Sequence, residues 1–163
     1  MGSNPTPSAM VDSFELAMEF AIVQAELALQ HGEVPVGAVV LHEGRIIAAR
    51  HNEREERNDP TAHAEILAIR DASEVLGRWR LFDCDLVVTL EPCLMCAGAL
   101  INSRIRTLAY GTSDPKAGAA GSLYNFFADP RLNHNPKIIH SVKLKETKSL
   151  LETFFLQKRR FQK

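Results

Sequence analysis

The sequence predicts an α/β fold, a three-layer sandwich in which helices flank a partly parallel, mixed sheet. Three observations support it. Apolar residues recur at helical spacing near both ends of the chain, a hairpin of two short apolar strands follows the first helix, and strand-like runs then alternate with helix-like runs. Such alternation is typical of α/β domains with parallel strands. With 163 residues and 45% hydrophobic content, we expect one domain over residues 12–163, after a disordered leader over residues 1–11.

The first part of the chain predicts a helix and a hairpin. The helix begins at Phe14, from which apolar residues recur at every third or fourth position up to Gly32, a residue that can end a helix. Residues 36–41 form a β-branched run, residues 43–44 predict a turn, and residues 45–49 form a second apolar run. Two such runs joined by a short turn predict a β-hairpin.

The middle of the chain predicts two helices and two strands in alternation. A polar loop over residues 50–59 leads to a helix over residues 61–76. An apolar, β-rich strand follows over residues 85–90, then a helix over residues 93–102 and a strand over residues 107–110. Because ligands collect at the carboxyl ends of strands in such sheets, we expect a site where these two helices begin.

The last part of the chain predicts a loop, a strand and an amphipathic helix. Residues 111–121 are rich in small residues and predict an irregular loop, residues 138–142 predict the last strand, and residues 146–161 predict the terminal helix. We expect the adjacent aromatic residues Phe154 and Phe155 to pack in the core rather than to stack on bases.

The near-neutral net charge of −1 conceals an asymmetry along the chain. From residue 130 onward, nine Lys and Arg stand against two Glu, which gives this part a charge of +7 and leaves −8 on the rest. A basic end on a near-neutral protein fits a polyanionic partner such as a nucleic acid. A solvated helix face would carry the same charges, and composition alone leaves both interpretations open.

The sequence also limits the cellular setting. No apolar run reaches the length of a membrane span, and no signal-peptide pattern opens the chain. Three cysteines argue against a disulfide framework and for a reducing compartment. We therefore expect a cytoplasmic protein without a membrane partner.

Two short motifs about thirty residues apart predict a metal site. His63 offers an imidazole, and Cys93 and Cys96 offer two thiolates in a Pro-Cys-x-x-Cys run. One nitrogen and two sulfur ligands suit Zn²⁺. The two cysteines lie on one face of a helix, and the helix N-terminus favours thiolate over thiol. We expect one Zn²⁺ per subunit, bound by these three residues.

Glu65 predicts that the metal site is catalytic. Three protein ligands leave the fourth tetrahedral position for water, which is typical of a catalytic zinc. Glu65 stands two residues after His63, so it can lie beside that water, accept its proton and later donate the proton to a leaving group. On an ideal helix residues two apart diverge, so the two side chains share a pocket only at a helix start.

Two other roles for these cysteines are open to test. Cys84 would convert the set into a closed structural Cys3His site, but the intervening strand of about 20 Å places it near the opposite end of the sheet. Cys93 and Cys96 would also fit a redox pair. That interpretation leaves His63 and Glu65 unexplained.

The sequence resembles the bacterial tRNA-specific adenosine deaminases, members of the cytidine/deoxycytidylate deaminase superfamily. The resemblance rests on residues 59–65 (DPTAHAE), residues 89–99 (TLEPCLMCAGA) and residues 114–123 (DPKAGAAGSL), and extends from about residue 14 to residue 160. The His-x-Glu and Pro-Cys-x-x-Cys pair alone marks the wider group of zinc nucleobase deaminases. The combination of three motifs is more specific.

The resemblance implies a fold, a reaction and a set of contacts. The fold is a cytidine-deaminase-like five-stranded sheet flanked by helices, assembled as a homodimer. The reaction is zinc-dependent hydrolytic deamination of adenosine to inosine at the wobble position (34) of a tRNA anticodon stem-loop, with release of ammonia. Matching positions imply that Glu65 is catalytic, that His63, Cys93 and Cys96 bind zinc, and that the substrate contacts are Asn52, Val34, Ala64, Asp114 and Lys116.

Two alternatives remain at this point. A deaminase of a free nucleobase or nucleoside (guanine, cytosine or cytidine) would use the same zinc chemistry without RNA. A zinc-stabilised RNA-binding module would keep the metal without catalysis. Steep salt dependence of binding would distinguish an RNA ligand from a neutral base.

Overall fold

The chain folds around one five-stranded sheet, which confirms the predicted fold class. The structure, a computed structural model, describes residues 10–161. The strand order is β2-β1-β3-β4-β5; β2, β1 and β3 are antiparallel neighbours, whereas β4 and β5 run parallel to β3. The strands are β1 (Gly37–His42), β2 (Arg45–His51), β3 (Cys84–Leu90), β4 (Thr107–Thr112) and β5 (Lys137–Ile139).

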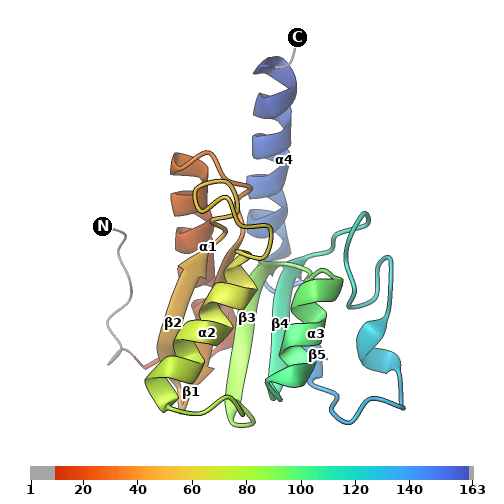
Figure 1. Cartoon of the computed structure of the whole chain (residues 1–163). Coiled ribbons are helices and arrows are strands. Elements are labelled where there is room, and N and C mark those ends of the chain that lie inside the picture. Colours follow the sequence, from red (N-terminus) through yellow and green to blue (C-terminus); the bar gives the residue numbers. More distant parts are fainter. Residues whose placement is uncertain (1–9, 162–163) are drawn as a thin grey trace.

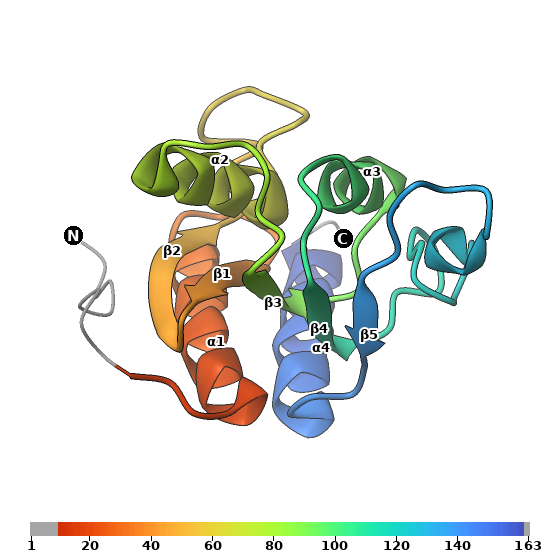
Figure 2. The same cartoon turned by 90° about the horizontal axis from the view of Figure 1, so that it is seen from below.

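Helices cover both faces of the sheet. Figure 2 shows α2 (Ala64–Leu76) and α3 (Leu94–Asn102) on one face, with α1 (Phe14–Gln30) and α4 (Leu144–Phe161) on the other. A short 3₁₀ helix, η1 (Phe126–Ala128), lies in the segment between β4 and β5. None of the helices within residues 10–161 is long and apolar enough to cross a membrane.

The sheet separates two layers of core. Leu86 and Val88 of β3 face the layer beneath α2 and α3, whereas Val87 between them faces the layer against α1. Every residue of β3 except the last is buried, because helices cover the strand on both sides. This explains why the strand reads as a continuous apolar run rather than as an alternating one.

Helix α1 packs directly on the backbone of β1 at a glycine. A Cβ atom on Gly37 would lie 1.9 Å from the carbonyl oxygen of Ala21 and 2.6 Å from the amide nitrogen of Ala25. The absence of a side chain at this position therefore sets the spacing between helix and sheet.

Helix α4 is exposed along most of its length and extends beyond the edge of the sheet (Figure 1). Thr147 is its one buried residue among those described. The expected core packing of the aromatic pair is wrong: Phe155 is 45% exposed and Phe154 is only half-buried. Toward its end, Phe155, Leu156 and Phe161 are exposed.

The two metal-motif helices begin later than predicted. Helix α2 begins at Ala64 instead of residue 61, and α3 begins at Leu94 instead of residue 93. The residues before them, His63 and Cys93, have extended backbones (ψ 151° and ψ 176°) and occupy the N-cap positions. The two candidate ligands therefore lie at the N-terminal ends of the helices.

Other boundaries differ as well. The last strand covers Lys137–Ile139 rather than residues 138–142, because Ser141 adopts a left-handed backbone conformation (φ 61°) that ends an extended run. Of the leader expected over residues 1–11, residues 1–9 lie outside the described residues. Val11 is ordered: it is buried, and its N–H donates to the Gly44 carbonyl oxygen at 2.6 Å.

Candidate metal centre and catalytic pocket

Three ligand atoms converge where α2 and α3 begin. The Nδ1 atom of His63 lies 3.7 Å from Sγ of Cys93 and 3.5 Å from Sγ of Cys96, and the three atoms lie within 4.8 Å of one another. A tetrahedral zinc with bonds of about 2.3 Å to sulfur and about 2.0 Å to nitrogen requires N···S separations of about 3.5 Å. The separations fit that ion.

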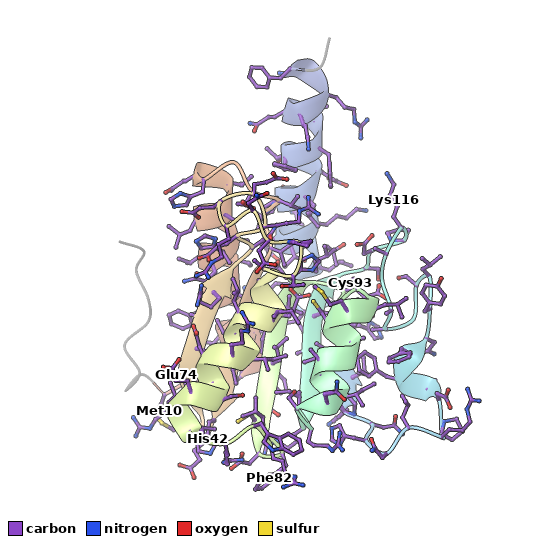
Figure 3. All side chains as sticks on the ribbon, in the orientation of Figure 1. Met10, His42, Glu74, Phe82, Cys93 and Lys116 are labelled. Atoms are coloured by element: carbon purple, nitrogen blue, oxygen red, sulfur yellow. The ribbon has the colours of Figure 1, made fainter. Side chains whose placement is uncertain are left out.

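The local sequence explains why these atoms meet. Cys93 is the N-cap of α3 and Cys96 lies in its first turn, while His63 is the N-cap of α2. Figure 3 shows Cys93 at the start of α3 and Lys116 farther out, on the loop above that helix. Helix N-termini carry unpaired N–H groups and a partial positive charge, which favour the anionic form of a nearby thiol.

The three ligand groups change one another's pKa. A hydrogen bond from Cys96, together with one from His63, lowers the pKa of Cys93 to about 4, against an ordinary value of 9.0. The contact with Cys93 and burial both raise the pKa of Cys96, and the hydrogen bond with Cys93 raises the pKa of His63. A metal ion that binds to these three groups would displace the protons that they share.

Glu65 is buried beside this cluster. Its residue is 4% exposed, and its Oε1 atom is the one buried side-chain oxygen or nitrogen without a hydrogen-bond partner among the described residues. Burial raises the pKa of its carboxyl group. An unpartnered buried carboxylate oxygen is costly, so this atom is suited to a water molecule or to a substrate.

A cavity of about 200 Å³ opens onto Glu65 and the ligands. Four of the five residues that the resemblance implied as substrate contacts line this cavity: Val34, Asn52, Ala64 and Asp114. Cys96 is fully buried beneath it, and Lys116 does not line it. Its lining residues are Val34, Val36, Asn52, Arg54, His63, Ala64, Glu65, Leu90, Glu91, Cys93, Asp114 and Ala117.

Asn52 is fixed in orientation within this cavity. Its Nδ2 donates to the Val34 carbonyl oxygen at 3.4 Å, and its Oδ1 accepts from the Arg54 N–H at 3.1 Å. The side chain is therefore held by both of its ends, with the amide edge at the cavity wall.

Lys116 lines a wider groove that borders the cavity. The groove has a volume of about 810 Å³, lies between α4 and the loop after β4, and shares Val34, Leu90 and Asp114 with the cavity. It carries three cations and two carboxylates. Its other lining residues are Thr112, Ser113, Pro115, Lys116, Lys148, Leu151, Glu152, Phe155, Leu156 and Arg159.

Sequence reasoning missed two charged residues of the cavity, Glu91 and Arg54. Glu91 follows a buried strand directly and precedes the Cys motif, which is a signal that could have identified it. Arg54 stands in a charged loop with five other Arg and Glu residues, and nothing in the sequence separates it from them. Only the fold shows that both side chains line the cavity.

Cys84, the alternative fourth ligand, lies away from the cavity, and so does His134. Cys84 begins β3, at the other end of the strand from the motif, and burial raises the pKa of its thiol to about 12. It does not belong to the ligand cluster. His134 bonds through Nε2 to the carbonyl oxygen of Ile105 at 2.6 Å, just after the C-terminal end of α3, whereas the cavity lies at the start of that helix.

The chain is similar in sequence to known deaminases, which fits the cluster of candidate metal ligands and Glu65. Residues 12–159 match the MafB19-like deaminase family. The tRNA-specific adenosine deaminase of Agrobacterium fabrum is 49% identical over 142 residues, which cover 87% of this chain and 93% of that protein.

Two solved structures are similar as well. One, from a study of A-to-I editing by tRNA:A34 deaminases at the wobble position of transfer RNA, is 48% identical with a TM-score of 0.80, and the match covers 82% of this chain and 97% of that one. A guanine deaminase from Bacillus subtilis is 35% identical with a TM-score of 0.62, over 77% of this chain and 83% of that one. The chain therefore belongs to the MafB19-like deaminases and, within them, to the family of the tRNA-specific adenosine deaminases.

Proposed function

We propose that this protein is a zinc-dependent deaminase that converts adenosine to inosine at the wobble position (34) of tRNA. The observation that carries the proposal is the buried Glu65 carboxylate, which lies beside three metal-ligand atoms in a cavity that borders a groove with three cations. The family to which the chain belongs supports the same reaction.

Zinc would be held by Nδ1 of His63 and by the thiolates of Cys93 and Cys96. When bound, it would lower the pKa of a water molecule and so provide the nucleophile near neutral pH. Cys96 is fully buried and Cys93 is half-buried, so the open side of the cluster is the side toward the cavity.

Glu65 would move the protons of the reaction. Its carboxylate accepts a proton from the attacking water, and oxygen bonds to C6 of the adenine. Glu65 then delivers that proton to N1, takes the second proton from the hydroxyl group now on C6 and passes it to the amino group, so the C6–N bond breaks, the C6 carbonyl forms and ammonia leaves. The raised pKa of this buried carboxyl group favours the protonated form that the second step needs.

The cavity would hold the adenine base after it leaves its neighbours in the anticodon loop. Such a loop already exposes its bases, so little pairing energy is lost. The fixed amide of Asn52 would hydrogen-bond the base or its ribose, while Val34 and Ala64 contact the base with apolar surface.

The groove would receive the flanking nucleotides. Lys116, Lys148 and Arg159 line it and can contact phosphate groups, and Asp114 stands where groove and cavity meet. The excess of positive charge after residue 130 adds to this attraction.

We also propose a homodimer in the cytoplasm. Large apolar side chains are exposed at the start of α3 and on a neighbouring loop: Leu94 is 45%, Leu123 52% and Tyr124 51% exposed. The loop reaches the start of α3 through a hydrogen bond from the Ala119 N–H to the Pro92 carbonyl oxygen at 2.8 Å. Exposed apolar patches of this kind mark protein interfaces, and a second copy would cover this one.

Deamination of a free base is the second candidate, and the 35% identity to a guanine deaminase favours it. It would use the same ligands, Glu65 and cavity. It would have no need of the groove with its cations.

A substrate panel tests the proposal. An anticodon stem-loop with adenosine at the wobble position is compared with free adenosine, guanine and cytidine, and both inosine and ammonia are measured. We expect turnover of the stem-loop alone, with a KM that rises steeply as salt is added. If guanine or cytidine is turned over and the stem-loop is not, the substrate is a free base or nucleoside and not RNA.

A further inference from the structure

Glu91 is a buried acidic residue that the reaction described above does not use. It is 2% exposed, follows the last residue of β3 and lines the catalytic cavity. A carboxylate at such a position is destabilising unless hydrogen bonds replace its water.

One loop supplies all the hydrogen bonds recorded for this carboxylate. Oε1 accepts from the Asp114 N–H at 3.1 Å and from the Ser122 hydroxyl, and Oε2 accepts from the N–H groups of Ala120 at 2.9 Å and Ser122 at 3.1 Å. These donors lie 23 to 31 residues away in the sequence. The carboxylate thus joins both ends of residues 114–122, hereafter the substrate loop.

The substrate loop is packed closely around the carboxylate. A Cβ atom on Gly118 would lie 2.4 Å from Oε2 of Glu91 and 2.6 Å from the Asp114 carbonyl oxygen. Pro92 is the residue next to Glu91, and its carbonyl oxygen accepts a hydrogen bond from the Ala119 N–H at 2.8 Å. The loop therefore has no room to move toward the carboxylate, and it is tethered to the segment that leads into Cys93.

The substrate loop carries the groups that face the substrate. Asp114 and Ala117 line the cavity, and Lys116 lines the groove. Oδ1 of Asp114 in turn accepts from the N–H groups of Lys116 and Ala117 at 3.1 and 3.2 Å. A displacement of Asp114 would therefore displace all three residues.

We infer that Glu91 is a positioning residue. Its carboxylate holds the substrate loop at a fixed distance from the metal ligand Cys93. Asp114 and Lys116 are thereby placed to contact the RNA nucleotides on either side of the reacting base. This inference rests on the proposed function for its substrate. In this role Glu91 acts through the loop and not directly on the metal ligands or the base.

The variant Glu91→Gln tests this role, because it keeps the size of the side chain but turns an NH₂ group toward N–H donors. We expect zinc to stay at one per chain and kcat to stay within about threefold, while KM for the stem-loop rises by about tenfold or more. Amide hydrogen exchange should accelerate in the substrate loop and not in α2 or α3.

Asp85→Asn is the matched control. Asp85 stands at the other end of the same strand, is also buried, and accepts from Arg106 at 3.0 and 2.9 Å. Its loss destabilises the fold without touching the substrate loop, so KM should stay unchanged. Equal KM values for Glu91→Gln and wild type, or equal KM increases in both variants, would overturn the inference.

Gly118→Ala approaches the same contact from the loop and keeps the carboxylate. Its added methyl group should displace the loop and reproduce the increase in KM, which covers the case in which Glu91→Gln fails to fold. If the wild-type protein forms no inosine, the proposed function fails. Hydrogen exchange of the substrate loop then still decides whether Glu91 holds it, since unchanged exchange in both variants contradicts the inference.

Discussion

At the scale of single residues, the site depends on two kinds of buried polar group. His63, Cys93 and Cys96 are close enough to share protons or a cation. Glu65 has a buried oxygen that no described residue satisfies. The first group is suited to bind a metal, and the second is suited to act on whatever the metal holds.

Substitutions at these residues separate metal binding from proton transfer. We expect Glu65→Ala to retain one zinc per chain but to lose kcat by about 10²- to 10⁴-fold, the usual contribution of a general acid–base group. Cys96→Ala should lose both zinc and turnover, because it removes a ligand. Metal analysis and inosine formation measured on the same samples check both; undiminished turnover in zinc-loaded Glu65→Ala contradicts the role of Glu65.

A second residue-scale prediction concerns acid stability. Burial tends to raise the pKa of Asp83, but hydrogen bonds from Arg78 and His42 outweigh it and lower that pKa from 3.8 to about 2. The folded state thus binds this proton more weakly than the unfolded chain does. The stabilisation is present above pH 4 and disappears as the pH falls through 2.

Urea unfolding of wild type and Asp83→Asn measures this contribution. Wild type should be the more stable protein at pH 5, and the difference between the two should shrink toward zero near pH 2. A difference that stays constant between these pH values would show that the Asp83 carboxylate has an ordinary pKa in the fold.

The sequence predicted that His63, Cys93 and Cys96 come together, with Glu65 beside them, because their pattern is short and its chemistry is specific. It did not predict that Glu91 and Arg54 line the cavity. The hydrogen-bond donors of Glu91 lie at least 23 residues away, and only the folded loop brings them together. Arg54 resembles every other charged residue of its loop until the cavity is known.

At the scale of elements, the beginnings of α2 and α3 determine the site. Both begin after an extended residue that is itself a candidate ligand, so the helices present their N-terminal N–H groups to the cluster. Spacing alone predicted the two helices but extended each over its N-cap, because helical periodicity carries no information on the backbone angles of the first residue.

Helix α4 packs closely on β4 at one buried residue. Thr147 is its buried residue, and a Cβ atom on Gly111 of β4 would lie 2.5 Å from the Thr147 side chain. We expect Gly111→Ala to cost about 1–3 kcal/mol of stability by overpacking and to accelerate amide exchange throughout α4. Because α4 forms one wall of the groove, KM for the stem-loop should also rise.

Gly98→Ala provides the comparison for this prediction. A Cβ atom at Gly98 meets nothing within 4 Å, and α3 lies on the opposite face of the sheet from α4. Exchange in α4 should therefore stay at the wild-type rate in this variant. If amide hydrogen exchange in α4 is equally fast in Gly111→Ala and Gly98→Ala, the contact between Gly111 and Thr147 does not hold the helix in place.

At the scale of the whole molecule, the mixed sheet brings distant segments to one place. The parallel strands β3 and β4 end at the same edge, where one leads into the Cys motif and the other into the substrate loop. The α/β class and the strand count followed from the sequence. The exposure of α4 did not, since an amphipathic pattern indicates an apolar face without indicating what covers it.

Inosine formation by chelator-treated protein, measured on a stem-loop with adenosine at the wobble position while zinc is added back, tests the central claim most directly. We predict no inosine without zinc, a rise in proportion to bound zinc, and no further rise beyond one zinc per chain. Full inosine formation without metal, or none with one zinc per chain, would contradict the proposed zinc-dependent deaminase.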